Sequence, residues 1–172
     1  MPFIDVPAGD APNLERAFHL RPDVFRAWQQ LNGAIKASSD LRRYELATLA
    51  AARRLRSSYC SLAHGKVLAE QFYDFETVAR LPDGLDDADR AIMAIAEKVV
   101  ADATSITQED VDDLKAHGLS DEDVVDAVLA AAARCFFSKT LDALGVQPDA
   151  SYGELDPAFR DALAVGRPIE DG

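Results

Sequence analysis

The chain has 172 residues, 48% hydrophobic and 28% charged, and this size and balance predict one soluble globular domain with its own core. The formal net charge of −12 disfavours nucleic acid and anionic membrane surfaces, so we predict neither as a partner. Two cysteines are too few for a disulfide framework, and the sequence has no recognisable signal peptide and no membrane-spanning apolar run, so we predict a cytoplasmic protein.

Helical periodicity dominates the chain after its first residues. Residues 1–13 carry three prolines and no periodic pattern, which predicts an N-terminal arm. Apolar residues then recur at helical spacing and predict helices over 21–38, 41–56, 57–72, 86–103, 107–118 and 120–145. Residues 148–172 form a polar C-terminal tail with a short helix near 156–165. Because no stretch alternates with period two, we predict an all-α single domain over 1–172, a bundle of about six to eight helices.

The stretch SSYCSLAH carries the chemically most informative spacing. Ser57, Cys60 and His64 stand at i, i+3 and i+7, so they share one face of a helix. Ser57 or Ser58 suits the N-cap, which would place Cys60 in the first turn, where free N–H groups and the helix dipole stabilise a thiolate. His64, one turn later, could exchange a proton with the thiol. The alternative is that Cys60 is a small buried hydrophobe, and spacing alone leaves both interpretations open.

Glu45 is a second candidate because it precedes the apolar run LATLAAA, at the edge of a helix that faces the core. A carboxylate in that position needs a partner. The alternative is a surface ion pair with Arg42, Arg43 or Arg53.

The remaining candidates have simpler interpretations. Cys135 follows the apolar stripe of the last long helix, so we predict that it lies in the core. One cysteine and one histidine are too few ligands for a metal, so we predict neither a metal nor a cofactor.

The motif resembles a known family. Glu45, eleven residues and then S-x-x-C-x-x-x-H resemble the pattern of the alkylhydroperoxidase D-like and carboxymuconolactone decarboxylase family, whose redox-active members carry Glu, then C-x-x-C, then x-x-x-H. The stretch ELATLAAARRLRSSYCSLAHGKVL resembles the family's core helix pair, and residues 107–146 resemble the acidic helix, turn and long helix that follow. The resemblance covers about 21–147, which would be the carboxymuconolactone decarboxylase-like core.

The resemblance implies an all-α fold, homo-oligomers and reduction of peroxides by a thiol. Cys60 matches the cysteine that attacks peroxide, and His64 and Glu45 match the proton relay. Ser57 stands where the family has its resolving cysteine, so no dithiol cycle can run within the motif. Either an external thiol or Cys135 resolves Cys60, or peroxidase activity has been lost.

We therefore predict a peroxidase-type oxidoreductase whose partners are a small-molecule hydroperoxide and an external thiol reductant. Two alternatives remain open. One is a decarboxylase or isomerase of a small carboxylated lactone, with His64 or Glu45 as general base. The other is a non-catalytic helical oligomer in which Cys60 senses oxidation or simply packs.

Overall fold

The computed structural model describes residues 2–171, and all regular structure within them is helical, which confirms the all-α prediction. The elements are α1 (Asn13–Ala17), α2 (Pro22–Ser38), α3 (Leu41–Arg54), α4 (Ser58–Gln71), α5 (Phe75–Arg80), α6 (Asp87–Asp102), η1 (Ala103–Ser105), α7 (Gln108–Ala116), α8 (Asp121–Ala143), η2 (Ala150–Glu154) and α9 (Pro157–Leu163). The nine α-helices of residues 2–171 exceed the six to eight predicted because α1 and α5 have only five and six residues, too few to show a period. Within the same residues, no helix is both long and apolar enough to cross a bilayer.

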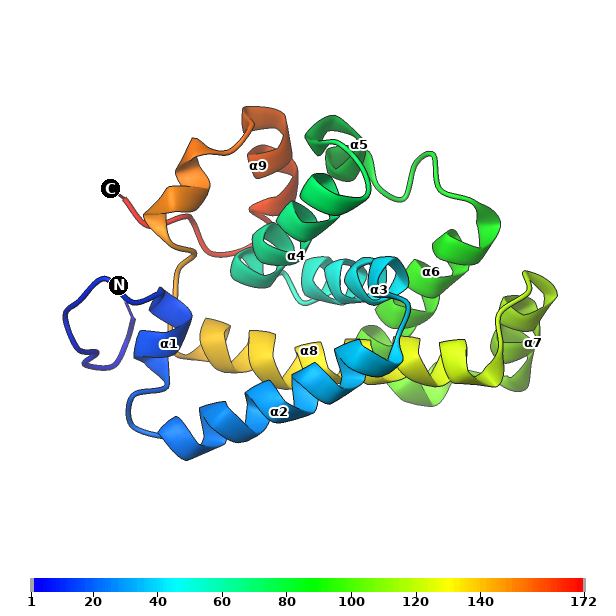
Figure 1. Cartoon of the computed structure of the whole chain (residues 1–172), viewed down its shortest axis with the longest axis horizontal. Coiled ribbons are helices and arrows are strands. Elements are labelled where there is room, and N and C mark those ends of the chain that lie inside the picture. Colours follow the sequence, from blue (N-terminus) through cyan, green and yellow to red (C-terminus); the bar gives the residue numbers. More distant parts are fainter. Residues whose placement is uncertain (1, 172) are drawn as a thin grey trace.

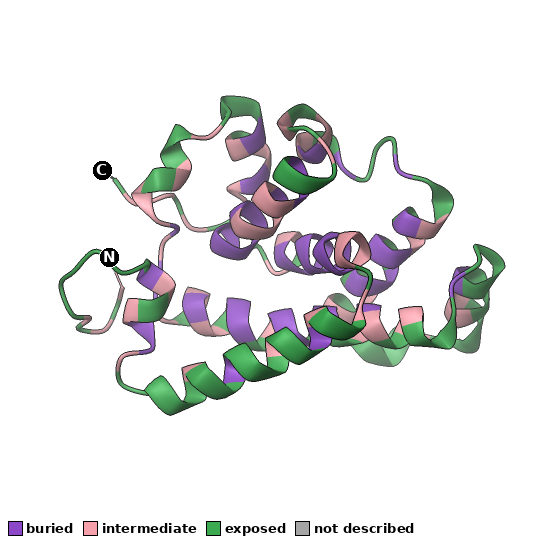
Figure 2. Ribbon diagram, viewed as in Figure 1, coloured by how far each residue is buried: buried purple, intermediate pink, exposed green. Residues whose placement is uncertain are grey.

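Helix α3 is the central element of the bundle. Every residue from Tyr44 to Ala52 is buried, and α4, α6 and α8 pack around this helix. Figure 2 shows this buried segment in the middle of the molecule. The alanines of α3 allow close approach on several sides at once, because a methyl side chain adds little radius to the helix. A polar side chain on this segment must therefore find its partner inside the protein.

Helices α2 and α8 form one side of the bundle, where they run side by side in opposite directions (Figure 1). Their aromatic side chains join them, since the rings of Trp28 and Phe137 stack with centroids 4.9 Å apart. The start of α8 is fixed locally by the Ser120 and Asp123 capping box. Gly145 follows the helix at φ 77°, a conformation that suits glycine.

A tight turn separates α3 from α4. Arg56 adopts a left-handed conformation with φ 58°, and Ser57 is the N-cap residue of α4. Figure 1 shows that the two helices are joined by this short connection only. The turn lets α4 pack directly against α3, so side chains of the two helices can meet.

The C-terminal segment packs against α4 and α5 through α9, which lies within the range predicted for a short helix. Phe159 and Leu163 of α9 are fully buried. They approach α4 at Gly65, where a Cβ atom would overlap Leu163 Cδ1. A larger residue at this crossing would force the Leu163 side chain to move.

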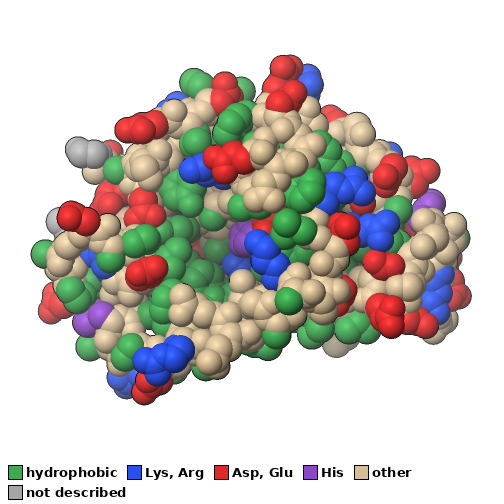
Figure 3. All heavy atoms as spheres, viewed as in Figure 1, with side chains coloured by type: hydrophobic (Ala, Val, Ile, Leu, Met, Phe, Trp, Pro, Cys, Tyr) green, Lys and Arg blue, Asp and Glu red, His purple; other side chains and the backbone are tan. Residues whose placement is uncertain are grey.

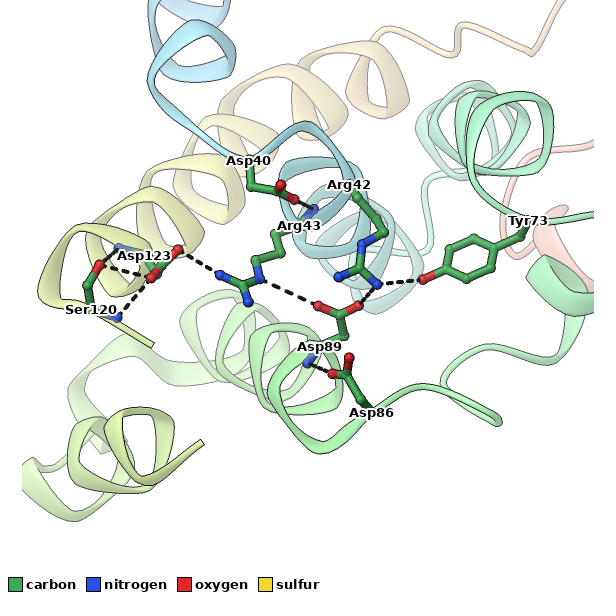
Figure 4. A network of polar contacts seen from close by, with 8 residues as sticks. All are labelled: Asp40, Arg42, Arg43, Tyr73, Asp86, Asp89, Ser120 and Asp123. Atoms are coloured by element: carbon green, nitrogen blue, oxygen red, sulfur yellow. Dashed lines mark hydrogen bonds and ion pairs between the residues drawn. The ribbon is translucent and has the colours of Figure 1, made fainter. Parts of the chain in front are cut away.

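A buried carboxylate, Asp89, ties α6 to α3 and α8 (Figure 4). Arg42 forms an ion pair with it, and Arg43 Nε lies 3.6 Å from it. Arg43 also reaches Asp123 at the start of α8, at 2.9 Å. Burial raises the pKa of Asp89 above its ordinary value, and Arg42 offsets part of that rise. Arg42 and Arg43, two of the arginines considered as partners of Glu45, therefore pair with Asp89 and Asp123 instead.

Candidate active site

Glu45 and His64 form a hydrogen-bonded pair between α3 and α4. His64 Nδ1 lies 2.6 Å from Glu45 Oε2. The Glu45 side chain is completely buried, while 15% of the His64 side chain is exposed. Lys36 of α2 donates to the other carboxylate oxygen, Oε1, at 2.9 Å. Two of the residues named from the sequence are thus brought together. Among residues 2–171, Glu45 forms no ion pair with Arg42, Arg43 or Arg53, the alternative partners considered from the sequence.

Arg134 of α8 contacts the opposite edge of the same imidazole. Its Nη1 lies 3.1 Å from His64 Nε2. A guanidinium group can only donate, so Nε2 must accept with its lone pair. The proton of the neutral imidazole then sits on Nδ1 and is donated to Glu45. The two contacts together select one tautomer of a neutral histidine.

The pKa values agree with this assignment. Burial lowers the pKa of His64, the hydrogen bond with Glu45 raises it in part, and the charge of Arg134 lowers it further, so the net direction is down. Burial would raise the pKa of Glu45, but its hydrogen bonds with His64 and Lys36 outweigh burial and bring the pKa below its ordinary value. The pair therefore rests as a carboxylate beside a neutral imidazole at neutral pH.

The network continues from Arg134 to α2. Arg134 Nη2 donates to Asn32 Oδ1 at 2.7 Å, and the Tyr44 hydroxyl donates to the same oxygen at 2.8 Å. The guanidinium carbon lies 4.9 Å from the centroid of the Trp28 ring. It also lies 5.4 Å from the centroid of Phe137, so aromatic rings cover the cation.

Cys60 stands in the first turn of α4, as predicted, but only 2% of its surface is exposed. Both ring nitrogens of His64 contact other residues, Glu45 and Arg134. Among residues 2–171 no hydrogen bond joins the thiol to the imidazole, so the direct proton exchange considered from the sequence has no contact in this structure. Burial, Asp149 and, least of the three, Cys60 raise the pKa of Tyr152 to about 12.

Ser57 and Cys135 depart from expectation. Ser57 is at the N-cap position and fully buried, yet its side chain makes no capping hydrogen bond. Cys135 is partly exposed, so the prediction that it lies in the core was wrong. The buried stripe of α8 runs beside it, through Ala130, Arg134, Phe137, Ser138 and Leu141. Because α8 is apolar over much of its circumference, its sequence does not reveal which stripe faces inward.

Arg134, Lys36 and Asn32 were missed by sequence reasoning. One signal was available for Arg134, a single cation inside the apolar run AVLAAAARCFF. Lys36 and Asn32 carried no signal, because both lie on a helix with many polar residues. In the part of the chain that the structure describes, no group of three or more His, Cys, Asp or Glu side chains is placed to hold a metal ion.

One face of the molecule is hollowed (Figure 3). Figure 3 shows a hollow between α2 and α4, with histidine and cationic side-chain atoms at its floor and hydrophobic atoms around them. The His64 side chain is itself partly exposed, so the imidazole can be reached from the surface. A small molecule that entered the hollow would meet an apolar wall and a polar floor.

The fold has several solved counterparts. A crystal structure described as an alkylhydroperoxidase AhpD core, a peroxidase-related protein from Ralstonia eutropha JMP134, matches with TM-score 0.73 and 24% identity over 93% of this chain and 85% of that one. A peroxidase-related protein from Silicibacter sp. TM1040 matches with TM-score 0.73 and 17% identity, covering 89% and 94%. A cysteine-to-alanine variant of the debrominase Bmp8, in complex with 2,3,4-tribromopyrrole, matches with TM-score 0.71 and 18% identity, covering 90% and 82%.

No family model and no curated protein matches this sequence. At the identities found, the structural likeness establishes the fold, which confirms the alkylhydroperoxidase D-like architecture that the motif suggested. The roles of the individual site residues stay predictions, since fold alone does not determine chemistry.

Proposed function

We propose that this protein is a thiol-dependent peroxidase-like enzyme in which Cys60 reduces a hydroperoxide and His64 with Glu45 handles the protons. The observation that carries the proposal is the Glu45–His64 pair. His64 lies one turn along α4 from Cys60, which is the buried cysteine of the two. A neutral imidazole of fixed tautomer backed by a carboxylate is an arrangement suited to general acid–base catalysis.

The proposed reaction balances with an external thiol. The Cys60 thiolate attacks the terminal peroxide oxygen, the O–O bond breaks, and the alkoxide leaves as an alcohol after taking up a proton. Cys60 is oxidised to a sulfenic acid and the peroxide is reduced. One external thiol then forms a mixed disulfide with loss of water, and a second thiol releases the Cys60 thiol and a disulfide product.

Two features of the site shape this scheme. Because His64 has no hydrogen bond to Cys60 in the described chain, protons pass between them through the substrate or a water molecule. Because Ser57 replaces the resolving cysteine, the reductant must come from outside the motif. The burial of the thiol favours a small substrate.

Peroxide consumption with dithiothreitol tests the proposal. Wild type should consume cumene hydroperoxide catalytically, and Cys60→Ser should reduce the rate to the uncatalysed level. Cys135→Ser is the matched control, because it removes the other cysteine and should retain the rate. Turnover that survives in Cys60→Ser, or is absent from wild type, would contradict the proposal.

The likeness to a debrominase supplies a second substrate class for the same thiol. Bromide release from 2,3,4-tribromopyrrole, measured with the same reductant and variants, decides between the two classes. Bromide release without peroxide turnover would replace peroxides with halogenated aromatics as the substrate.

We also propose that the protein is a homo-oligomer and that α2 and α8 form the contact between copies. An open groove of about 480 Å³ between these helices is lined by Val24, Ala27, Trp28, Leu31, Ile35, Leu129, Ala132, Ala133 and Phe136. None of these is charged, and several large members are exposed. An apolar surface of this kind suits contact with the same surface of a second copy, because it carries no charged side chains that would repel each other across the contact.

Sedimentation velocity tests the contact. Leu31→Glu places a charge in the groove and should shift the protein toward monomer. Phe72→Glu, at an exposed apolar residue outside the groove, should not. A wild-type monomer at micromolar concentration would contradict the proposal.

A further inference from the structure

Arg134 is a buried charge without an opposite charge beside it. The described chain has three buried charged side chains, Glu45, Asp89 and Arg134. Glu45 is paired with Lys36 and hydrogen-bonded to His64. Asp89 is paired with two arginines. Arg134, with 3% of its surface exposed, forms no ion pair with any carboxylate of residues 2–171, and Glu45 is linked to it only through the neutral imidazole.

The hydrogen-bonding capacity of Arg134 is also incompletely used. A guanidinium group has five N–H donors. Nη1 donates to His64 and Nη2 donates to Asn32, and both acceptors are neutral. Nε is buried and has no acceptor among the described residues. Three of the five N–H donors therefore have no acceptor among the described residues.

The local charge strengthens this point. Lys36 and Glu45 cancel, His64 is neutral, and Arg134 leaves the site with a net charge of +1. An uncompensated buried cation is strongly unfavourable unless an anion or water satisfies it. The stacking of Trp28 and Phe137 against the guanidinium limits its contact with water but supplies no negative charge.

From these observations we infer that Arg134 forms the recognition site for a carboxylate on the substrate, so that the enzyme prefers anionic over neutral substrates. This inference rests on the proposed function for the identity of the reacting group, a hydroperoxide, but not for the binding of the anion. The planar fork of arginine matches the two oxygens of a carboxylate. A carboxylate at Arg134 would lie next to His64, one turn along α4 from Cys60.

Binding is tested first, without turnover. Trp28 is the single tryptophan of the chain and stacks on Arg134, so its fluorescence reports on the site. We expect benzoate to give a saturable change with a Kd about 10- to 100-fold below that of benzamide, the range typical of charge-assisted hydrogen bonds. Cys60→Ser should bind benzoate like wild type, so this result is independent of peroxidase activity.

Variants assign the effect to Arg134. Arg134→Gln should abolish the preference for benzoate, and Arg134→Lys, which keeps the charge but not the fork, should retain a smaller one. Lys98→Gln is the matched control, because it removes a cation that pairs with Asp110 outside this network, and it should keep the preference. If Arg134→Gln does not fold, a preference that is smaller in Arg134→Lys than in Lys98→Gln still supports the inference, and equal preferences contradict it.

Kinetics then test selectivity. We expect kcat/KM for cumene hydroperoxide carrying a para-carboxylate to exceed that for cumene hydroperoxide at least tenfold in wild type, and the ratio to fall toward one in Arg134→Gln. Equal binding of benzoate and benzamide by wild type, or an unchanged preference in Arg134→Gln, would overturn the inference. Benzoate binding without peroxide turnover would uphold the anion site and reject the proposed function.

Discussion

The two buried carboxylates allow the role of Glu45 to be separated from its contribution to stability. Replacing Glu45 with Gln keeps the shape of the side chain but removes its charge. The carboxylate accepts from His64 at 2.6 Å and from Lys36 at 2.9 Å, whereas an amide has only one oxygen. In the variant one of these donors must face the amide NH2 group, which cannot accept.

The magnitude follows from these contacts. A hydrogen bond to a charged group contributes about 1.5–3 kcal/mol, and an unsatisfied buried donor costs about as much. Lys36 is 42% exposed and can be hydrated, so losing its hydrogen bond to the side chain at position 45 costs less stability than losing the hydrogen bond from His64. We expect Glu45→Gln to lower the free energy of unfolding by about 2 kcal/mol.

Asp89→Asn is the matched control. Asp89 is as buried as Glu45 and faces Arg42 and Arg43 (Figure 4), so the variant should lose a similar amount of stability. It leaves the Glu45–His64 pair intact. Both variants should be measured by urea unfolding at one protein concentration, and peroxide consumption should be assayed where both are more than 99% folded.

We expect Glu45→Gln to slow peroxide reduction about 10²- to 10⁴-fold, the usual contribution of general acid–base catalysis, and Asp89→Asn to change it by less than about threefold. Equal losses of activity in the two variants would show that Glu45 acts through stability alone. An unchanged rate in Glu45→Gln would refute the proton relay itself.

Three further predictions follow from single contacts. Ser57→Cys should form a disulfide with Cys60 on mild oxidation and should speed turnover with a dithiol. The substitution should cost little stability because the Ser57 side chain makes no capping hydrogen bond. An unchanged number of free thiols after one equivalent of peroxide would contradict this prediction. The pKa of His64 in the folded protein lies below its ordinary 6.5, so below about pH 6.5 the unfolded state binds more protons than the folded state and stability should fall. The difference in unfolding free energy between pH 7.5 and pH 5.5, measured with urea, should be smaller in His64→Gln than in wild type. An equal difference in the two proteins would assign the pH effect to other groups. Gly65→Ala should destabilise the protein by about 1–3 kcal/mol by forcing α9 away from α4, whereas Gly33→Ala, with open space around it in α2, should stabilise it by up to about 1 kcal/mol; thermal unfolding of both decides, and two stabilised variants would disprove the close packing at α9.

The sequence determined the local features of this protein. The capping boxes at Thr107 and Ser120 begin α7 and α8 within one residue of the predicted helix starts, because capping depends on residues three positions apart. Helical periodicity predicted the all-α class, and the N-cap pattern placed Cys60 in a first turn. These features need no knowledge of which helices pack together.

The tertiary structure alone decided the partners and the burial. His64 lies 70 residues from Arg134 in the chain, so no spacing rule could join them. In α8, apolar residues surround the helix, and only packing against α2, α3 and α6 determines that Arg134 faces inward while Cys135 stays partly exposed. Periodicity predicts that a helix has a buried stripe, but where every stripe is apolar the neighbouring helices decide which one is buried.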